Sequence, residues 1–499
     1  MKKFIALLIV ILYVQTACAA EADRAFFGVK DEMLRADYWI KRTKGAQKVL
    51  LTPAEIAELS ARLKNSRGTH CKDVLAVPEL MTRDAVLTEM KNFTSLPKAK
   101  RYIMLRDPDV RYCDAEKHYC NASGHRCNLS EFCCNASARY CDACEDFCSP
   151  VEHYRIADES YRDEVTLNAN IDNIDETVFV RYAVVTSNGT LKALPCDDAL
   201  YESEDDVLFD TNVVSTVKIW EPLAILHESR DGKFFFAIGG YCSGWISKEE
   251  CALCDRETLR EMAALPFLVV TGSRVTSDID VFMQNRGRRE FLMGTKLPIA
   301  NDIRSDEYDG VTRAFSRVVF VPERVDDGML LITHERLPLS ADVSEGYLPY
   351  TRTNVIRQAF KMLGEVYGWG GSFGSRDCSA FVRDIYLTFG IELPRNSRAQ
   401  ATAPIGHIDT SKLEPDEKER ILAKSGAGTL VQMPGHIMMY IGTYDKRPYI
   451  IHAAYSLGSR SEYFKVIRRA NCVVVSDMMM SRRDGKRIID SVTNINVIR

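Results

Sequence analysis

Residues 368–390 read GWGGSFGSRDCSAFVRDIYLTFG, a glycine-rich loop that runs into an apolar segment. Apolar residues recur at every fourth position from Phe381 to Phe389, which predicts a helix that begins at Cys378. Asp377, directly before it, is a residue type that caps helices. A thiolate is stabilised at a helix N-terminus by the positive end of the helix dipole. The stretch therefore predicts Cys378 as a nucleophile, with a buried structural cysteine as the alternative.

Two histidines downstream are the candidate bases. His436 follows a Pro-Gly turn and opens the apolar run HIMMYIG, and His452 lies inside the run YIIHAAY. Both runs predict strands, and adjacent antiparallel strands would bring the two imidazoles together. We expect His436 to take the proton of the thiol and His452 to orient His436. The alternative for each residue is a core histidine whose hydrogen bonds are satisfied.

The pattern around these residues, from 351 to 499, is that of an α/β domain. TNVIRQAFKMLGEVY (353–367) has apolar residues at helical spacing and predicts a first helix. GTLVQM (428–433) predicts a strand just before the two that carry the histidines.

Residues 155–345 are typical of β-structure. Short β-branched or aromatic runs, such as TVFVRYAVVTS (177–187) and KFFFAIG (233–239), alternate with turn signals such as Ser-Asn-Gly and Arg-Asp-Gly. This pattern predicts two successive small β-barrels, over 155–255 and 262–345.

The N-terminal region, residues 24–106, is predicted to be mainly helical. In LTPAEIAELSARLKN (51–65), Thr52 and Glu55 have the spacing of a capping box, followed by apolar residues at helical spacing. A cysteine-rich insertion follows over 107–150 and shows little apolar periodicity.

The chain has 16 cysteines, and half of them crowd this insertion: Cys113, Cys120, Cys127, Cys133, Cys134, Cys141, Cys144 and Cys148. Such density favours disulfides in an oxidising compartment. Zinc is the alternative, because Cys141–Cys144 and Cys251–Cys254 have the C-x-x-C spacing of zinc ligands. Without Cys18, fifteen cysteines remain, an odd number that leaves at least one thiol unpaired within the chain.

Residues 1–20 read as a signal peptide, with two lysines, a short apolar run and the small residues TACAA. Simple cleavage is preferred to lipidation of Cys18, because Gln15 stands where a lipoprotein signal has an aliphatic residue. An anchor or buried helix is the alternative. The net charge of −4 gives no basis for nucleic-acid binding. We expect an exported monomer without a cofactor or an integral membrane segment.

The C-terminal motifs resemble those of the NlpC family of bacterial cysteine peptidases, which have a reduced papain-like fold. The matching motifs are YGWGG (367–371), DCSAF (377–381), LPRNSRAQ (393–400), PGHIMMYIG (434–442) and IIHAA (450–454). The resemblance implies a triad of Cys378, His436 and His452, with the hydroxyl of Tyr367 helping to hold the oxyanion. Ala380 stands where the family has glycine.

The rest of the chain resembles one branch of this family, with paired SH3-like domains over 155–345 and an N-terminal stabilising segment over 24–150. The cysteine-rich insertion is outside that pattern. The branch implies an α+β multidomain protein whose first SH3-like domain closes over the active site. It also implies hydrolysis of the γ-D-glutamyl–diamino acid bond in peptidoglycan stem peptides with a free N-terminal L-Ala.

Substrate-binding positions follow from the same resemblance. Glu221 in IWEPLAIL, with Asp377, is expected to bind the substrate ammonium, and Tyr241 in GYCSGWI is expected to line the pocket. Further positions that match are Trp369, Ser379, Asn396 and Ser397, although relatives often have Asp at the place of Asn396. A solvated charge on the barrel is the alternative for Glu221.

Three other functions remain open. An amidase or acyltransferase would use the same thiol chemistry, with an apolar acyl slot in place of the acidic pocket. A catalytically inactive protein that binds the cell wall is the second. A zinc protein built on the C-x-x-C pairs is the third.

Overall fold

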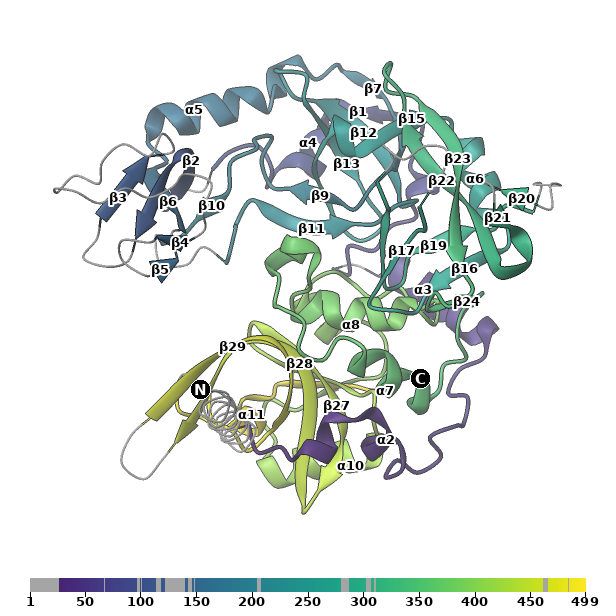
Figure 1. Cartoon of the computed structure of the whole chain (residues 1–499), viewed down its shortest axis with the longest axis vertical. Helices are drawn as coiled ribbons and strands as arrows, with labels where there is room; N and C mark the ends of the chain where they lie inside the picture. The colour runs from purple at the N-terminus through teal and green to yellow at the C-terminus, as the bar shows by residue number, and fades with distance from the viewer. Residues whose placement is uncertain are drawn as a thin grey trace, which may run out of the picture.

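The computed structural model describes residues 27–499 except 67, 97–98, 100, 114–117, 122–139, 142–145, 148, 204–207, 280–286, 302–306, 309–310, 461–464 and 483. Predictions on the signal peptide, on Cys18 and on disulfides or zinc in the cysteine-rich insertion lie outside the described residues. Figure 1 shows the C-terminal domain as one lobe and the β-rich domains as a second lobe above it.

The C-terminal domain contains a six-stranded antiparallel sheet in the order β25-β30-β26-β27-β28-β29. Its strands are β25 (His407–Asp409), β26 (Leu430–Met433), β27 (His436–Tyr444), β28 (Arg447–Arg460), β29 (Lys465–Asp477) and β30 (Asn494–Asn496). The helices are α7 (Arg352–Phe360), α8 (Cys378–Leu387), α9 (Ser397–Thr402), α10 (Pro415–Ser425) and α11 (Ile488–Ser491). The helices predicted to begin near residue 353 and at Cys378, and the three strands predicted in 428–455, are confirmed.

The core of this domain forms where α8 packs on the sheet. Phe381 and Ile385 on α8 are fully buried in one cluster with Ile437, Ile441 and Ile451 of the central strands. Burying side chains of this size contributes about 1.5–3 kcal/mol each to the stability of the fold. The packing fixes the N-terminus of α8 against the strands that carry the two histidines.

The N-terminal residues complete the same core. The short helix α2 (Ala36–Ile40) lies beside α7 in Figure 1, and Trp39 is fully buried. The ring of Trp39 lies 5.2 Å from that of Tyr449 on β28, and the Tyr449 hydroxyl donates a hydrogen bond to the Gly28 carbonyl. The first described residues of the chain are therefore part of the C-terminal domain.

The first SH3-like domain is a seven-stranded sheet in the order β11-β9-β14-β13-β12-β8-β15. Its strands are β8 (Arg181–Val185), β9 (Gly189–Lys192), β11 (Val213–Val217), β12 (Pro222–Glu228), β13 (Phe234–Ile238), β14 (Ser243–Ser247) and β15 (Cys251–Cys254). All five residues of β13 are buried, although successive side chains point to opposite faces. Phe235 packs inside the barrel, whereas Phe234 and Phe236 pack in a second cluster with Val86 and Met90 of the N-terminal segment.

The second SH3-like domain follows α6 (Arg256–Ala264). It contains β16 (Phe267–Val270), β17 (Arg274–Thr276), β18 (Glu290–Leu292), β19 (Lys296–Pro298), β22 (Ser316–Arg324), β23 (Leu330–Pro338) and β24 (Val343–Glu345). Leu268, Val270, Phe291, Val319 and Leu337 form its core. Together with the C-terminal domain, these barrels confirm the predicted fold class.

The N-terminal segment contains α3 (Pro53–Lys64) and α4 (Arg83–Met90). The capping box predicted for α3 is confirmed: the Thr52 hydroxyl accepts from the Glu55 amide, and the Glu55 carboxylate accepts from the Thr52 amide at 2.7 Å. The helical prediction for 24–106 misses two strands, β1 (Leu80–Thr82) and β2 (Tyr102–Cys113). β2 forms a ladder with β6 (Ser149–Ile156), which joins the two ends of the insertion.

The described cysteines outside the insertion are free thiols: Cys71, Cys196, Cys242, Cys251, Cys254, Cys378 and Cys472. Disulfides are therefore not formed by any of these seven cysteines, and the unpaired thiols include six besides the candidate nucleophile Cys378. No group of three His, Cys, Asp or Glu side chains among the described residues is arranged to hold a metal ion. Within the described ranges, no helix combines the length and the apolar character needed to cross a membrane.

Candidate active site

The candidate nucleophile, Cys378, is the first residue of α8, and Asp377 is the N-cap. One carboxylate oxygen of Asp377 accepts hydrogen bonds from the amides of Ser379 and Ala380, at 3.0 and 2.8 Å. The thiol itself is buried beside the backbone amide of Ile437, the residue that follows His436 on β27. The capped helix therefore holds the thiol at the start of the histidine-bearing strand.

Two histidines and a serine on three neighbouring strands, β27, β28 and β29, form a hydrogen-bonded chain. His436 Nε2 lies 2.7 Å from His452 Nδ1, and His452 Nε2 lies 2.9 Å from the hydroxyl of Ser476 on β29. His452 is fully buried. Because Nε2 of His436 is engaged by His452, its Nδ1 is the nitrogen left to act as base. Ser476 was not found from the sequence, because a serine two strands away from the thiol has no motif of its own.

Both groups of the candidate pair are neutral in the free protein. Burial raises the pKa of the Cys378 thiol to about 12, helped by the charge of Asp377, while the amides of Ile437 and Ser379 act in the opposite direction. Burial lowers the pKa of His436 to about 4 and that of His452 well below its ordinary value. The thiol is therefore not a preformed thiolate, and nucleophilic attack requires transfer of its proton to His436.

A buried ion pair supports the N-terminus of α8. The Arg395 guanidinium lies 2.7 Å from the second carboxylate oxygen of Asp377 and donates to the hydroxyls of Ser379 and, from the first SH3-like domain, Ser215. Burial opposes ionisation of Asp377, but the charge and hydrogen bonds of Arg395 and the other donors outweigh it and hold the pKa of Asp377 below its ordinary value. Arg395 lies in the motif LPRNSRAQ (393–400), but the sequence analysis did not identify it as a site residue.

A cavity of about 530 Å³ lies over the thiol and collects most of the predicted residues. From the C-terminal domain it is lined by Tyr367, Trp369, Asp377, Cys378, Ser379, Asn396 and Ser397, and from the first SH3-like domain by Val213, Val214, Tyr241, Cys242 and Ser243. The first SH3-like domain is therefore one wall of the cavity that contains the nucleophile.

The glycine-rich loop makes this contact between the domains. Gly370 and Gly371 have positive φ angles of 62° and 101°. A Cβ on Gly370 would lie 2.4 Å from Val213 Cγ1, and a Cβ on Gly371 would lie 1.9 Å from Thr216 Oγ1. Only glycine fits this close approach to β11, so the loop brings the domain against the active site.

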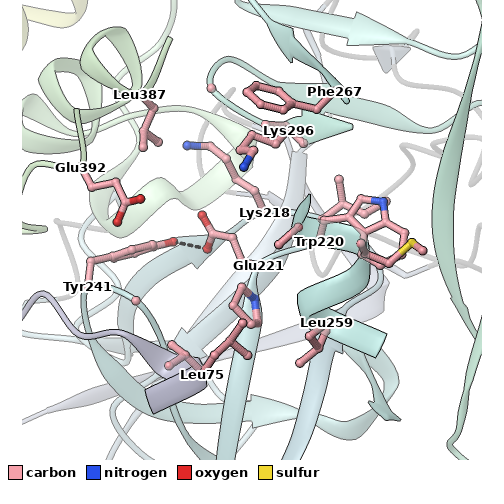
Figure 2. Close-up of a pocket in the computed structure, with 18 of the residues that line it drawn as sticks. Leu75, Lys218, Trp220, Glu221, Tyr241, Leu259, Phe267, Lys296, Leu387 and Glu392 are labelled. Atoms are coloured by element: carbon pink, nitrogen blue, oxygen red, sulfur yellow. Dashed lines mark hydrogen bonds between the residues drawn. The ribbon is translucent and has the colours of Figure 1, made fainter. Parts of the chain in front are cut away.

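Glu221 is the predicted residue that the structure does not bring to the thiol. It lines a neighbouring cavity, drawn in Figure 2, where one carboxylate oxygen accepts a hydrogen bond of 2.6 Å from the Tyr241 hydroxyl. Tyr241 borders both cavities. The expected pair of Glu221 and Asp377 in one pocket is thus not formed, because the Tyr241 ring stands between the two cavities.

Two further predicted residues have additional contacts. The Asn396 side-chain oxygen accepts from the Ala399 amide at 2.8 Å and caps α9, so this oxygen has a structural role. Tyr367 is buried. Burial is the main cause that raises the pKa of its phenol, and the nearby Cys378 raises it further. The ring of Phe209, which the sequence analysis did not identify, lies 5.9 Å from the Tyr367 ring and 5.2 Å from that of Trp369.

Comparison with known proteins agrees with this geometry. Residues 364–471 match the sequence profile of the NlpC/P60 family. Residues 364–471 are an NlpC/P60 domain. Residues 199–247 match the SH3 domain of the SH3b1 type. The NlpC/P60 family is a family of cysteine peptidases, and the chain is a cysteine-type peptidase by this domain. No curated protein matches the sequence.

Most of the chain shares its fold with a solved NlpC/P60 endopeptidase from Photobacterium damselae subsp. piscicida. The match has 15% identity and a TM-score of 0.62, and it covers 93% of this chain and 96% of that one. An NlpC/P60 family protein from Bacillus cereus is 16% identical over 64% of this chain and 100% of that one, with a TM-score of 0.43. The Mycobacterium tuberculosis peptidoglycan hydrolase RipB is 22% identical over 30% and 65%, with a TM-score of 0.19.

Proposed function

We propose that the protein is an exported cysteine endopeptidase that hydrolyses stem peptides of peptidoglycan at the γ-D-glutamyl–diamino acid bond, in peptides with a free N-terminal L-Ala. The observation that carries the proposal is the hydrogen-bonded chain from His436 through His452 to Ser476, on a strand whose next residue, Ile437, presents its amide to the thiol of Cys378. An NlpC/P60 domain combined with an SH3b domain supports the cell wall as the substrate and an extracytoplasmic location.

The reaction follows from the protonation states of the free site. With a peptide bound, His436 Nδ1 accepts the proton of Cys378, and the sulfur attacks the scissile carbonyl carbon. His452 and Ser476 hold the imidazole so that it accepts at Nδ1 and bears its own proton at Nε2. His436 then returns the proton to the departing amine, which leaves a thioester on Cys378. Water hydrolyses the thioester with His436 as base again.

The oxyanion of each tetrahedral intermediate needs donors that are already in place. Tyr367 lines the cavity beside the thiol and keeps its hydroxyl proton, since burial raises its pKa. A phenol that stays protonated is a donor throughout the cycle. We assign the Tyr367 hydroxyl to this role.

The size of the cavity supports short, free peptides as substrates. The volume of about 530 Å³ is bounded on one side by the first SH3-like domain, which leaves less room for a glycan-attached chain than an open groove would. We assign the L-Ala ammonium to Asp377 and Tyr241, because the other carboxylate in the cavity wall, Glu89, is paired with Lys72. Glu221 acts on that ammonium through the hydroxyl of Tyr241, to which it is hydrogen-bonded.

The test is mass spectrometry of defined muropeptides after digestion. The expected products of a free L-Ala–γ-D-Glu–diamino acid peptide are the L-Ala–D-Glu dipeptide and the released diamino acid peptide. The Cys378→Ala protein is expected to release neither. N-acetylation of the L-Ala is expected to reduce kcat/KM by about two orders of magnitude, because it removes the ammonium charge and the charge-assisted hydrogen bonds that this charge makes to Asp377 and Tyr241.

Two results would contradict separate parts of the proposal. Equal cleavage of free and acetylated peptides would refute recognition of the amine while leaving the cysteine chemistry intact. Full activity of the Cys378→Ala protein would refute the mechanism as a whole.

A further inference from the structure

The cavity in Figure 2 is a second site, separate from the one that contains Cys378. Its volume is about 310 Å³, and it lies where the N-terminal segment, both SH3-like domains and α8 meet. Figure 2 shows the charged ends of Lys218, Lys296, Glu221 and Glu392 gathered around it. Its apolar walls include Trp220, Leu259, Phe267 and Leu387. No bond is made or broken in this space in the proposed peptidase reaction, although Glu221 in its wall is hydrogen-bonded to Tyr241 of the peptidase cavity.

The wall of the cavity contains a buried guanidinium whose donors lack close acceptors. The Arg383 side chain is 7% exposed and stacks on the Tyr241 ring, with its guanidinium carbon 3.4 Å from the ring centroid. The nearest carboxylate oxygens belong to Glu221 at 3.7 Å and Asp384 at 3.9 Å, both beyond hydrogen-bond distance. Its Nε is buried and has no partner among the described residues. Arg383 is thus held only by long ion pairs, and its donors remain free to bind a further carboxylate.

A second cation on the cavity wall, Lys296, has no ion-pair partner in the described part of the chain. The Lys296 ammonium lies over the rings of Phe267 and Tyr347, at 4.4 and 5.9 Å from their centroids. In the described part of the chain no carboxylate oxygen lies within ion-pair distance of it, whereas Lys64 pairs with Glu392 and Lys218 pairs with Asp384. Among the described residues, the charge of Lys296 is therefore not balanced by an ion pair, and the charge of Arg383 is balanced only by long ones.

We propose that this cavity binds the free α-carboxylate of an amino acid or short peptide with an apolar side chain, with Arg383 as the carboxylate receptor and Lys296 as the second positive charge. The carboxylates of Glu221 and Glu392 in the same walls repel a dianion such as phosphate, so a monoanion is favoured. They also offer acceptors to the amine or amide of such a ligand. The aromatic and aliphatic walls accommodate its side chain.

The experiment is a calorimetric titration of the full chain with the Cys378→Ala substitution, which prevents turnover. The probe is N-acetyl-L-leucine, which has a carboxylate and an apolar side chain, and its matched control is N-acetyl-L-leucinamide, which lacks the charge. We expect the acid to bind with one-to-one stoichiometry. The amide is expected to bind roughly tenfold more weakly or not at all, because a charge-assisted hydrogen bond contributes about that factor.

Two substitutions locate the bound acid. Lys296→Met retains the length and packing of the side chain, and Arg383→Gln removes the guanidinium. Each is expected to weaken binding by about tenfold. Lys412→Met, which changes an exposed lysine, is the matched control and is expected to leave the affinity unchanged. If Arg383→Gln unfolds the protein, Lys296→Met, which breaks no ion pair, still decides the result.

The proposal is overturned by any of three outcomes. The acid and the amide bind equally, or neither Lys296→Met nor Arg383→Gln changes the affinity for the acid, or inorganic phosphate binds more tightly than the acid. The first would show that no carboxylate is recognised, the second that the ligand lies elsewhere, and the third that the site accepts a different class of anion.

Discussion

Asp377 and Arg395 form an ion pair with 2.7 Å between carboxylate oxygen and guanidinium nitrogen, and both side chains are nearly excluded from solvent. Asp377 caps the helix that begins at Cys378, while Arg395 also donates to Ser215 of the first SH3-like domain. One buried pair thus links the position of the nucleophile to the position of the neighbouring domain.

Arg395→Met is expected to lower the free energy of unfolding by about 3–5 kcal/mol, because it leaves the buried carboxylate of Asp377 without its counter-charge. Urea denaturation followed by circular dichroism measures the change. Arg398→Met, an exposed arginine three residues later, is the control and should stay within about 0.5 kcal/mol of the wild type. Equal effects of the two substitutions would show that the ion pair does not stabilise the fold.

Replacing members of the histidine chain should reduce activity in a graded order. His436→Ala removes the base and is expected to lower kcat/KM by about 10²–10⁴-fold. His452→Ala should cost less, since it removes only the orienting contact, and Ser476→Ala less still. Steady-state kinetics on a muropeptide gives the order. A Ser476→Ala loss as large as that of His436→Ala would contradict the assigned roles.

The stability of the protein should decrease as the pH falls from about 6.5 toward 4. The pKa of His436 is about 4 in the folded protein, so between these values the unfolded chain binds a proton that the folded chain does not. Linkage therefore lowers the free energy of unfolding across this window, and His436→Gln should reduce the slope. Urea midpoints at a series of pH values provide the measurement, and an unchanged slope in the variant would contradict the assignment.

The same pKa values predict activity over a wide pH range. A neutral thiol and a neutral imidazole persist from about pH 4 upward, so the acid limb of kcat/KM should lie below the ordinary histidine pKa of about 6.5. A pH–rate profile on a substrate without titratable groups in that range tests this. An acid limb near 6.5 would indicate a solvated His436.

Gly371→Ala is expected to reduce activity strongly, because the new Cβ would lie 1.9 Å from Thr216 Oγ1 and force the first SH3-like domain away. Gly364→Ala is the matched control: its φ is also positive, at 86°, but its Cβ would meet nothing within 4 Å. The control should show only the backbone strain, about 1 kcal/mol. Equal kcat/KM values for the two variants would refute the close contact.

Alkylation of the native protein should distinguish buried thiols from paired cysteines. Burial raises the pKa values of Cys71 and Cys196 to about 11 and those of Cys242, Cys251 and Cys254 to about 12, so these thiols should react slowly with iodoacetamide. After unfolding without a reductant, all of them should be labelled. Peptide mapping by mass spectrometry detects this, and any of these cysteines that stays unlabelled until reduction would show a disulfide.

The local features of the site could be predicted from the sequence, whereas its pairings across domains could not. The capping position of Asp377 and the strand positions of His436 and His452 follow from short-range patterns, and the structure brings them together as expected. The location of Glu221 depends on how two domains dock, which no local pattern encodes. Arg395 and Ser476 were missed for the same reason: their partners lie in other strands or in another domain.

The contact between Tyr449 and Gly28 has a consequence for how the protein is made. Their hydrogen bond joins positions 421 residues apart, and Trp39 packs into the same core. Because synthesis proceeds from the N-terminus, the partners of Gly28 and Trp39 are the last large part of the chain to emerge. Folding with contacts of such long range is slow. The segment that contains Gly28 and Trp39 keeps its apolar side chains exposed to solvent until the C-terminal domain has been synthesised. A truncated product of interrupted translation would therefore lack both the catalytic domain and the means to bury its own first helices, which makes it a substrate for quality-control proteases.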